Sequence, residues 1–388
     1  MKKTSLLVMF MVLGNMLVSA QHNCCKSNSS LSTTLERHTK SYAALDEEGK
    51  LVPYEFELRE VGEHDVLIEI LYSGVCHSDI HQAHGHWGNS LYPMVPGHEI
   101  TGRVLKVGSK VKGFKVGDYA GVGAMINSCG ECANCKAGKE QFCLNKKTVY
   151  TYNNKDFEHN YEVTKGGYAK KIVVKDHFVF KIPKSAPIEK IGPLFCAGIT
   201  VYSPLKKAEI KKGDKIGIAG FGGLGHLAVK YAVSMGADVT VFDISEEKRE
   251  IALKMGATKF VNVNKPEDLR GLNSSFKTIL SLIPAKFDVA MYIKMLQYGG
   301  ELVLIGQPAL DQVPDVSTQV FVENPGRKMY FSLIGGVPET KEMLDYSIKH
   351  NIYPDIEIIS MQDINDAFKK VVAGEVRFRY VIDMSTLK

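Results

Sequence analysis

Two short stretches of the sequence concentrate side chains that can bind metal ions. The stretch CHSDIHQAHGHWG (residues 76–88) holds one cysteine, one aspartate and four histidines in thirteen positions. The stretch NSCGECANCKAGKEQFC (residues 127–143) holds four cysteines with the spacing C-x2-C-x2-C-x7-C. Thiolates and neutral imidazoles are the usual protein ligands of zinc. The sequence therefore predicts metal chemistry and leaves open which of these side chains take part.

The four-cysteine stretch predicts a closed tetrahedral zinc site. Two-residue gaps allow consecutive thiolates to reach one ion, and the glycines at 130 and 138 indicate a loop whose shape the metal would hold. Two disulfides and an iron–sulfur cluster are the alternatives. We favour zinc because disulfides do not require cysteines at every third position. The predicted ligands are Cys129, Cys132, Cys135 and Cys143.

A second motif, in KIGIAGFGGLGHLAVKYAVSMGADVTVFD (residues 215–243), predicts a dinucleotide site. A buried strand at 215–219 runs into the turn G-x-G-x-x-G, and apolar residues then recur with helical spacing. Such a turn lets a pyrophosphate approach the backbone and the N-terminus of the following helix. Asp243 ends the next strand and can accept hydrogen bonds from ribose hydroxyls; a glycine-rich turn without a ligand is the alternative. The predicted contacts of the turn are Gly220, Gly222, Gly223, Leu224 and Gly225.

The remaining pattern predicts two domains of different character. Further strands (277–283, 301–306 and 330–335) and helices (245–256 and 285–296) favour a doubly wound parallel sheet over residues 189–332. Residues 50–188 alternate short apolar runs with Gly and Pro turns, which is typical of short β-strands. The tail (333–388), with a helix at 342–350 and a strand at 378–384, is expected to fold onto this first domain.

The N-terminus and the composition limit location and partners. Lys2 and Lys3, an apolar run over 6–18 and Val-Ser-Ala at 18–20 predict a secretory signal peptide at 1–20, followed by a linker at 21–37. An uncleaved anchor or a start codon placed too early is the alternative. We expect a periplasmic or secreted protein, with the cytoplasm as the alternative location. A net charge of +5 without a Lys/Arg block, and no later long apolar stretch, argue against nucleic-acid and membrane partners.

The stretch GHEITGRVLKVGSKV (residues 97–111) resembles the zinc alcohol dehydrogenase pattern G-H-E-x2-G-x5-G-x2-V at each fixed position. The stretches GVGAMINSC, LFCAGITVYSPL and GFGGLGHLAVK are similar to the cinnamyl-alcohol-dehydrogenase-like branch of the medium-chain dehydrogenases. The resemblance covers roughly residues 38–385. It implies an α/β fold, with a mainly β, GroES-like catalytic domain (38–188 and 333–388) and a Rossmann-type domain (189–332).

The resemblance also assigns roles to individual residues. It implies a catalytic zinc bound by Cys76, His98 and Cys196, with Glu99 able to approach it, and a structural zinc on the four clustered cysteines. Ser78 would hydrogen-bond the substrate alcohol, His81 would pass its proton toward solvent, and Asp79 would orient the zinc-binding histidine. Further cofactor contacts would come from His77, Thr200, Lys248 and Ile334. His84 and His86 receive no role, and Trp87 would line the substrate pocket or serve only in packing.

The resemblance implies reversible oxidation of a primary alcohol, aromatic or allylic substrates included, with hydride transfer to a nicotinamide. Zinc lowers the pKa of a bound water from about 15.7 to about 7, and a similar shift would activate an alcohol. The branch usually takes NADP(H), but Asp243 would repel a 2′-phosphate, so we expect a preference for NAD(H). A homodimer is expected. A polyol or sugar-alcohol dehydrogenase and a non-catalytic relative that binds nucleotide or zinc are the alternatives.

Overall fold

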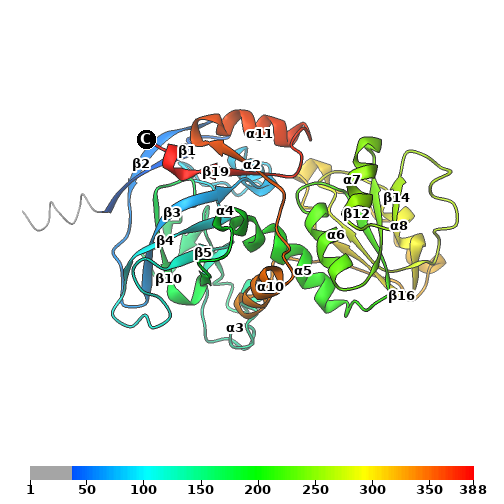
Figure 1. The fold of residues 1–388 in the computed structure, drawn as a ribbon, viewed down its shortest axis with the longest axis horizontal. Coiled ribbons are helices and arrows are strands. Elements are labelled where there is room, and N and C mark those ends of the chain that lie inside the picture. The colour runs from blue at the N-terminus through cyan, green and yellow to red at the C-terminus, as the bar shows by residue number, and fades with distance from the viewer. Residues whose placement is uncertain (1–36) are drawn as a thin grey trace, which may run out of the picture.

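A computed structural model describes residues 37–388, and its two large sheets confirm the predicted α/β fold. Figure 1 shows a mainly β lobe, which contains the first strands of the chain, beside a lobe with helices around a second sheet. The predicted signal segment and nearly all of the predicted linker lie outside the described residues. Within residues 37–388, no helix is long and apolar enough to cross a membrane.

The first sheet is mainly antiparallel and includes strands from both ends of the described chain. Its order is β11-β5-β4-β3-β19-β18, and β10 also pairs with β3. The strands are β3 (Asp65–Gly74), β4 (Ile100–Val107), β5 (Tyr119–Val122), β10 (Lys171–Lys175), β11 (Val179–Ile182), β18 (Ile356–Ser360) and β19 (Arg379–Asp383). Because β19 pairs antiparallel with β3, the C-terminal segment, red in Figure 1, returns to this lobe. The residue boundaries of the two domains stay a prediction.

The second sheet has six parallel strands in the order β14-β13-β12-β15-β16-β17. The strands are β12 (Lys215–Ala219), β13 (Asp238–Asp243), β14 (Lys259–Asn262), β15 (Phe276–Ser281), β16 (Leu296–Leu304) and β17 (Lys328–Phe331). The order reverses direction at β12, and ligands of such sheets bind beyond the strand ends at this point. The sequence did not predict β14. Strand β17 ends at Phe331, four residues before the end of the predicted strand 330–335, because the chain there leaves the sheet.

The strands of the parallel sheet are apolar on both faces because helices cover both. Ile218 and Leu280 belong to one core cluster, whereas Ala219 and Ile279, their neighbours in sequence, belong to the cluster on the other face. The covering helices include α6 (Gly225–Ser234), α7 (Arg249–Lys254), α8 (Val289–Met295) and α9 (Gln319–Glu323). A separate core cluster fills the mainly β lobe.

The remaining elements connect the two sheets or cover their edges. Helix α5 (Ala197–Lys207) and helix α10 (Val337–Lys349) lie side by side between the lobes in Figure 1, joined by hydrogen bonds between their side chains. Helix α10 begins five residues before the predicted helix. The other elements are β1 (His38–Ala44), β2 (Leu51–Glu57), α2 (His77–Ala83), β6 (Met125–Asn127), α3 (Ala133–Lys136), β7 (Val149–Tyr150), β8 (Lys155–Asp156), β9 (Glu162–Val163), α4 (Ile188–Ile191) and α11 (Ile364–Val372).

Candidate metal centres and nucleotide-binding turn

The first metal cluster joins residues from three distant parts of the chain. Cys76 precedes α2, His98 and Glu99 precede β4, and Cys196 precedes α5; their ligand atoms all lie within 4.8 Å of one another. The Sγ atoms of Cys76 and Cys196 are 3.8 Å apart, and His98 Nε2 is 3.1 Å from Cys196 Sγ. The Cys76 and Cys196 thiols are free and buried. Two thiolates and an imidazole nitrogen, grouped in this way, form a donor set that suits zinc.

Asp79 contacts the segments that carry Cys76 and His98 and fixes their orientation. Its carboxylate accepts hydrogen bonds from the backbone N–H groups of Cys76 (3.0 Å) and Gly97 (3.1 Å) and from the hydroxyl of Tyr168 (3.1 Å). His98 Nδ1 lies 3.1 Å from Asp79 Oδ1. An ionised carboxylate only accepts, so Nδ1 donates and Nε2 keeps its lone pair toward the thiols.

Glu99 and Arg379 form a buried pair beside the cluster. Glu99 Oε1 lies 3.3 Å from Arg379 Nη1, yet neither Glu99 oxygen has a hydrogen-bond partner among the described residues. Burial raises the pKa of Glu99 to about 7, against the opposing effect of Arg379. Such a carboxylate can turn toward a metal ion. The sequence did not single out Arg379, because an isolated arginine in a strand carries no motif.

His81 lies on α2 with its ring between several aromatic neighbours. Its Nδ1 is 3.0 Å from Nδ1 of the exposed His86, and its Nε2 is buried without a hydrogen-bond partner in the described chain. The ring of Trp87 stacks on it at 5.2 Å between centroids. Burial and the neighbouring rings of His77 and His86 lower the pKa of His81 to about 4. His86, which received no role from the sequence, therefore contacts the predicted relay histidine.

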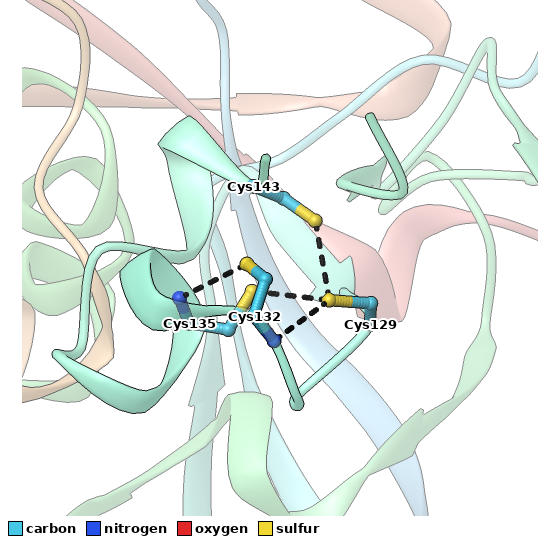
Figure 2. Close-up of side chains that lie close together, drawn as sticks. All are labelled: Cys129, Cys132, Cys135 and Cys143. Carbon is cyan, nitrogen blue, oxygen red and sulfur yellow. Dashed lines mark hydrogen bonds between the residues drawn. The ribbon is translucent and has the colours of Figure 1, made fainter. Parts of the chain in front are cut away.

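The four clustered cysteines form the second metal site. Figure 2 shows the thiols of Cys129, Cys132, Cys135 and Cys143 pointing toward one another, and their Sγ atoms lie within 4.8 Å. All four are free thiols, so the disulfide alternative is wrong for this structure. The backbone N–H of Cys135 donates to Cys132 Sγ, and that of Cys132 donates to Cys129 Sγ. These N–H groups favour the thiolate form that zinc binds.

The glycine-rich turn follows β12 as predicted. Gly220 has a φ of +95°, and a Cβ on Gly225 would lie 2.2 Å from Gly220 O, so the turn needs glycine at both positions. A Cβ on Gly223 would lie 3.2 Å from Arg379 Nη2, which places that guanidinium beside the turn. Asp243 accepts hydrogen bonds from Phe221 N (2.7 Å) and Ser245 N (2.9 Å).

The other predicted cofactor residues lie on several elements. Lys248 Nζ is 3.3 Å from both oxygens of Asp243. Thr200 is on α5, one turn after Cys196, and Ile334 follows β17 and is half-buried against both lobes' cores. His77 begins α2, and burial lowers its pKa. The roles assigned to these residues stay predictions.

Comparison with known proteins identifies the family. Residues 62–184 match the model of the alcohol dehydrogenase GroES-like domain, and residues 223–348 match that of the zinc-binding dehydrogenases. A probable formaldehyde dehydrogenase, AdhA, of Bacillus subtilis is 44% identical over 352 residues, which is 91% of this chain and 99% of the relative. The mannitol dehydrogenase of Apium graveolens is 44% identical over 359 residues, 91% of this chain and 96% of the relative.

A solved structure agrees with these matches over both lobes. The structure described as CAD from Helicobacter pylori complexed with NADP(H) is 47% identical, has a TM-score of 0.86, and covers 90% of this chain and 99% of its own. The two clusters of zinc ligands and the glycine-rich turn fit this relationship. The chain belongs to the zinc-containing medium-chain alcohol dehydrogenases, close to the cinnamyl alcohol and mannitol dehydrogenase branch, and is an NAD(P)-dependent alcohol dehydrogenase.

Proposed function

We propose that this enzyme interconverts apolar primary alcohols, aromatic or allylic, and their aldehydes. The observation that carries the reaction is the convergence of Cys76, His98 and Cys196 on one point. A zinc ion bound there supplies Lewis acidity, which makes an alcohol O–H easier to deprotonate. The chain's own residues must then hold the alcohol, remove its proton and keep the nicotinamide in position.

The hydrogen bonds of Trp87, whose ring stacks on His81, and of Tyr92, which binds the end of α2, support an apolar substrate. The indole Nε1 of Trp87 donates to Pro308 O at 3.0 Å, and the Tyr92 hydroxyl donates to Ala83 O at 2.8 Å. Neither donor is therefore available to the extra hydroxyls of a polyol, whereas the face of the indole can contact an aromatic ring. The 44% identity to the Apium mannitol dehydrogenase makes oxidation of a polyol the second candidate function.

We infer that Ser78, His81 and His86 take part in removing the proton. The Ser78 hydroxyl lies 3.6 Å from Cys76 Sγ, which places it beside the metal ligands. The Nε2 of His81 is buried without a hydrogen-bond partner in the described chain, and its Nδ1 lies 3.0 Å from Nδ1 of the exposed His86. A neutral imidazole with a low pKa accepts a proton only briefly, which suits transfer onward to solvent.

A substrate panel assayed by the absorbance of the reduced cofactor tests this proposal. We expect cinnamaldehyde and benzaldehyde to be reduced with kcat/KM at least about tenfold above that for mannitol oxidation, because a buried unpaired hydroxyl costs at least this much. Mannitol as the best substrate would establish the polyol function instead. Zinc-loaded protein that turns over neither class would reject both.

We propose that NAD(H) is the preferred cofactor. The carboxylate of Asp243 ends β13, where it can accept from a free ribose hydroxyl and repels a 2′-phosphate. Lys248 offsets part of this negative charge. The Helicobacter pylori structure contains NADP(H), so the comparison of NADH with NADPH at equal concentration is decisive, and faster turnover with NADPH would contradict the proposal.

We propose that two copies associate through the edge of the parallel sheet. Strand β17 has no neighbour on its outer side among the described strands, and the apolar side chains of Phe331, Val322 and Tyr298 are exposed nearby. Exposed apolar edge strands commonly pair with a second chain. Light scattering should give twice the chain mass, and Phe331→Lys should give monomers; a monomeric native protein would contradict the pairing.

The cellular location stays a prediction. The basic start and the apolar run at 6–18 favour export, with the cytoplasm as the alternative. The comparisons give no support to a signal peptide. Sequencing the N-terminus of the protein made in its own host would settle the question, because a start near residue 21 requires cleavage.

A further inference from the structure

The loop that holds the four clustered cysteines contacts the segment that leaves the parallel sheet. Gln141 Nε2 donates to Ile334 O at 3.1 Å, and the backbone N–H of Val337 donates to Glu140 Oε2 at 3.0 Å. The two backbones touch: a Cβ on Gly336 would lie 1.9 Å from Gly138 O. Residues 138–141 therefore fix residues 334–337, although nearly two hundred positions separate them in sequence.

Glu140 replaces the missing local cap of α10. The N-cap residue of α10 is Gly336, which has no side chain to bind the free N–H groups of the first turn. Glu140 is 1% exposed, and its carboxylate meets this helix N-terminus, where a negative charge is favourable. Its other oxygen lies 2.9 Å from His177 Nε2. Both oxygens are thus used in holding α10 against the mainly β lobe.

The segment fixed in this way leads to the cofactor and to the catalytic metal ligands. Ile334, whose carbonyl Gln141 binds, is one of the predicted cofactor residues. Helix α10 in turn holds α5 through hydrogen bonds from Ser203 Oγ to Glu339 (2.9 Å) and from Tyr202 OH to Glu342 (3.0 Å). Helix α5 begins directly after Cys196. A continuous set of contacts therefore joins the four-cysteine loop to Ile334, at the predicted cofactor site, and to Cys196, at the first metal cluster.

We propose that Glu140 and Gln141 are positioning residues for the nicotinamide cofactor, acting through the segment 334–337. The loop of four cysteines then has a task beyond its own stability: it holds the Ile334 carbonyl and the start of α10 at a fixed place relative to the mainly β lobe. This inference rests on the proposed function in one respect, because it takes Ile334 as a cofactor contact.

Three variants separate positioning from local stability. Gln141→Leu removes the hydrogen-bond donor to Ile334 O. The other polar atom of the side chain, Gln141 Oε1, has no partner in the described chain, so its loss breaks no further hydrogen bond. Glu140→Ala removes the cap of α10, whereas Glu140→Gln keeps an acceptor oxygen for Val337 N. The matched control is Glu131→Gln, at an exposed glutamate of the same loop whose side chain accepts a hydrogen bond from Asn145.

The readouts are zinc content, the dissociation constant of the reduced cofactor measured by its fluorescence, and kcat with KM. We expect Gln141→Leu and Glu140→Ala to keep two zinc ions per chain and to weaken cofactor binding about fivefold, the equivalent of one hydrogen bond. The cofactor KM should rise in parallel, with kcat changed less. Glu140→Gln and the Glu131→Gln control should stay within about twofold of the native protein.

The outcomes either support the positioning role of Glu140 and Gln141 or exclude it. Cofactor binding that is unchanged in zinc-replete Gln141→Leu overturns the positioning role. If Glu140→Ala loses zinc, Glu140 supports the metal site itself, and the Gln141→Leu result alone decides. If the native protein binds no reduced cofactor, the proposed function is rejected. If the native protein binds the cofactor and the variants bind it equally well, only the positioning role is rejected.

Discussion

Asp79 shows how one buried carboxylate sets the chemistry of its neighbours. Its two oxygens accept from two backbone N–H groups, from Tyr168 and from His98 Nδ1. The last of these contacts fixes the tautomer of His98 and aims Nε2 at the thiols. The family resemblance implied the partnership with His98, but nothing in the sequence predicted Tyr168, which lies 89 positions away.

His81 should be needed for proton transfer and not for metal binding. We expect His81→Gln to lower kcat about a hundredfold at neutral pH, since general acid–base groups contribute about that much. High concentrations of a small imidazole buffer should restore part of the rate, and zinc content should stay at two ions per chain. The control is His84→Gln on the same stretch. Full activity of His81→Gln without added buffer would contradict the relay.

Asp243 should set the choice of cofactor. We expect Asp243→Ser to move the ratio of kcat/KM for NADH over that for NADPH by about tenfold toward NADPH, because it removes a negative charge beside the 2′-position and leaves Lys248 unpaired. The measurement is the pair of kcat/KM values. Glu247→Gln, at an exposed position four residues on, removes the same charge and should leave the ratio unchanged.

At the scale of elements, the structure explains where local sequence failed. The predicted helix at 342–350 begins at Val337, and no Ser, Thr, Asp or Asn occupies its N-cap, because Glu140 caps it from another part of the chain. A local pattern cannot reveal such a cap. The turn after β12 was predicted correctly because its glycines, strand and helix are contiguous. Strand β14, which has four residues, was not predicted.

Helix α6 is joined to the C-terminal part of the chain by a buried histidine. His226 Nδ1 lies 3.2 Å from Gly222 O and therefore donates, whereas the backbone N–H of Asp355 donates to Nε2 at 3.3 Å. Only the neutral ring satisfies both partners. Burial, with Lys230 and Arg379, lowers the pKa of His226 to about 3. Protonation of Nε2 would place its N–H against the backbone N–H of Asp355, so this hydrogen bond would be lost and the two donors would repel each other.

This arrangement predicts a loss of stability in acid. The folded pKa is below the ordinary value near 6.5, so the contribution of His226 is complete above about pH 6.5 and falls as the pH drops toward 3. We expect it to add up to about 1.4 kcal/mol per pH unit to the decline in the free energy of unfolding. Urea unfolding at pH 6.5, 5.5 and 4.5 should show a shallower decline for His226→Gln, and no change of slope for His64→Gln, at an exposed site. Equal slopes for native protein and His226→Gln would contradict it.

At the scale of the whole molecule, contacts between the two lobes were the least accessible to sequence analysis. The four-cysteine site and the nucleotide turn were predictable because each sits in a short motif with fixed spacing, whereas the ligands of the first metal cluster are far apart in sequence and were expected only from the family resemblance. The contact of Trp87 with Pro308, and that of Leu310 N with His86 O at 3.3 Å, depend on how two separate sheets pack together. No periodicity or spacing encodes that packing.

Zinc removal should affect the two clusters differently. Within residues 129–143, no apolar side chain is buried apart from Cys135 and Cys143, so this loop depends on its metal. We expect dialysis against a chelator to abolish activity and to allow trypsin to cleave the loop after Lys136 and Lys139, while both sheets keep their circular dichroism signal. Mass spectrometry of the fragments locates the cuts, and added zinc should restore protection. A metal-free protein that resists trypsin at this loop would contradict the prediction.

The guanidinium of Arg379 has two neighbours of different kinds, Glu99 at the first metal cluster and Gly223 at the nucleotide turn. An anionic cofactor bound at that turn would compete with the glutamate for one cation. We therefore expect occupancy of either ligand site to alter affinity at the other, and thermodynamic reciprocity requires the factor to be the same in both directions. The expected consequence is a heterotropic coupling between metal ion and nucleotide that a single side chain transmits.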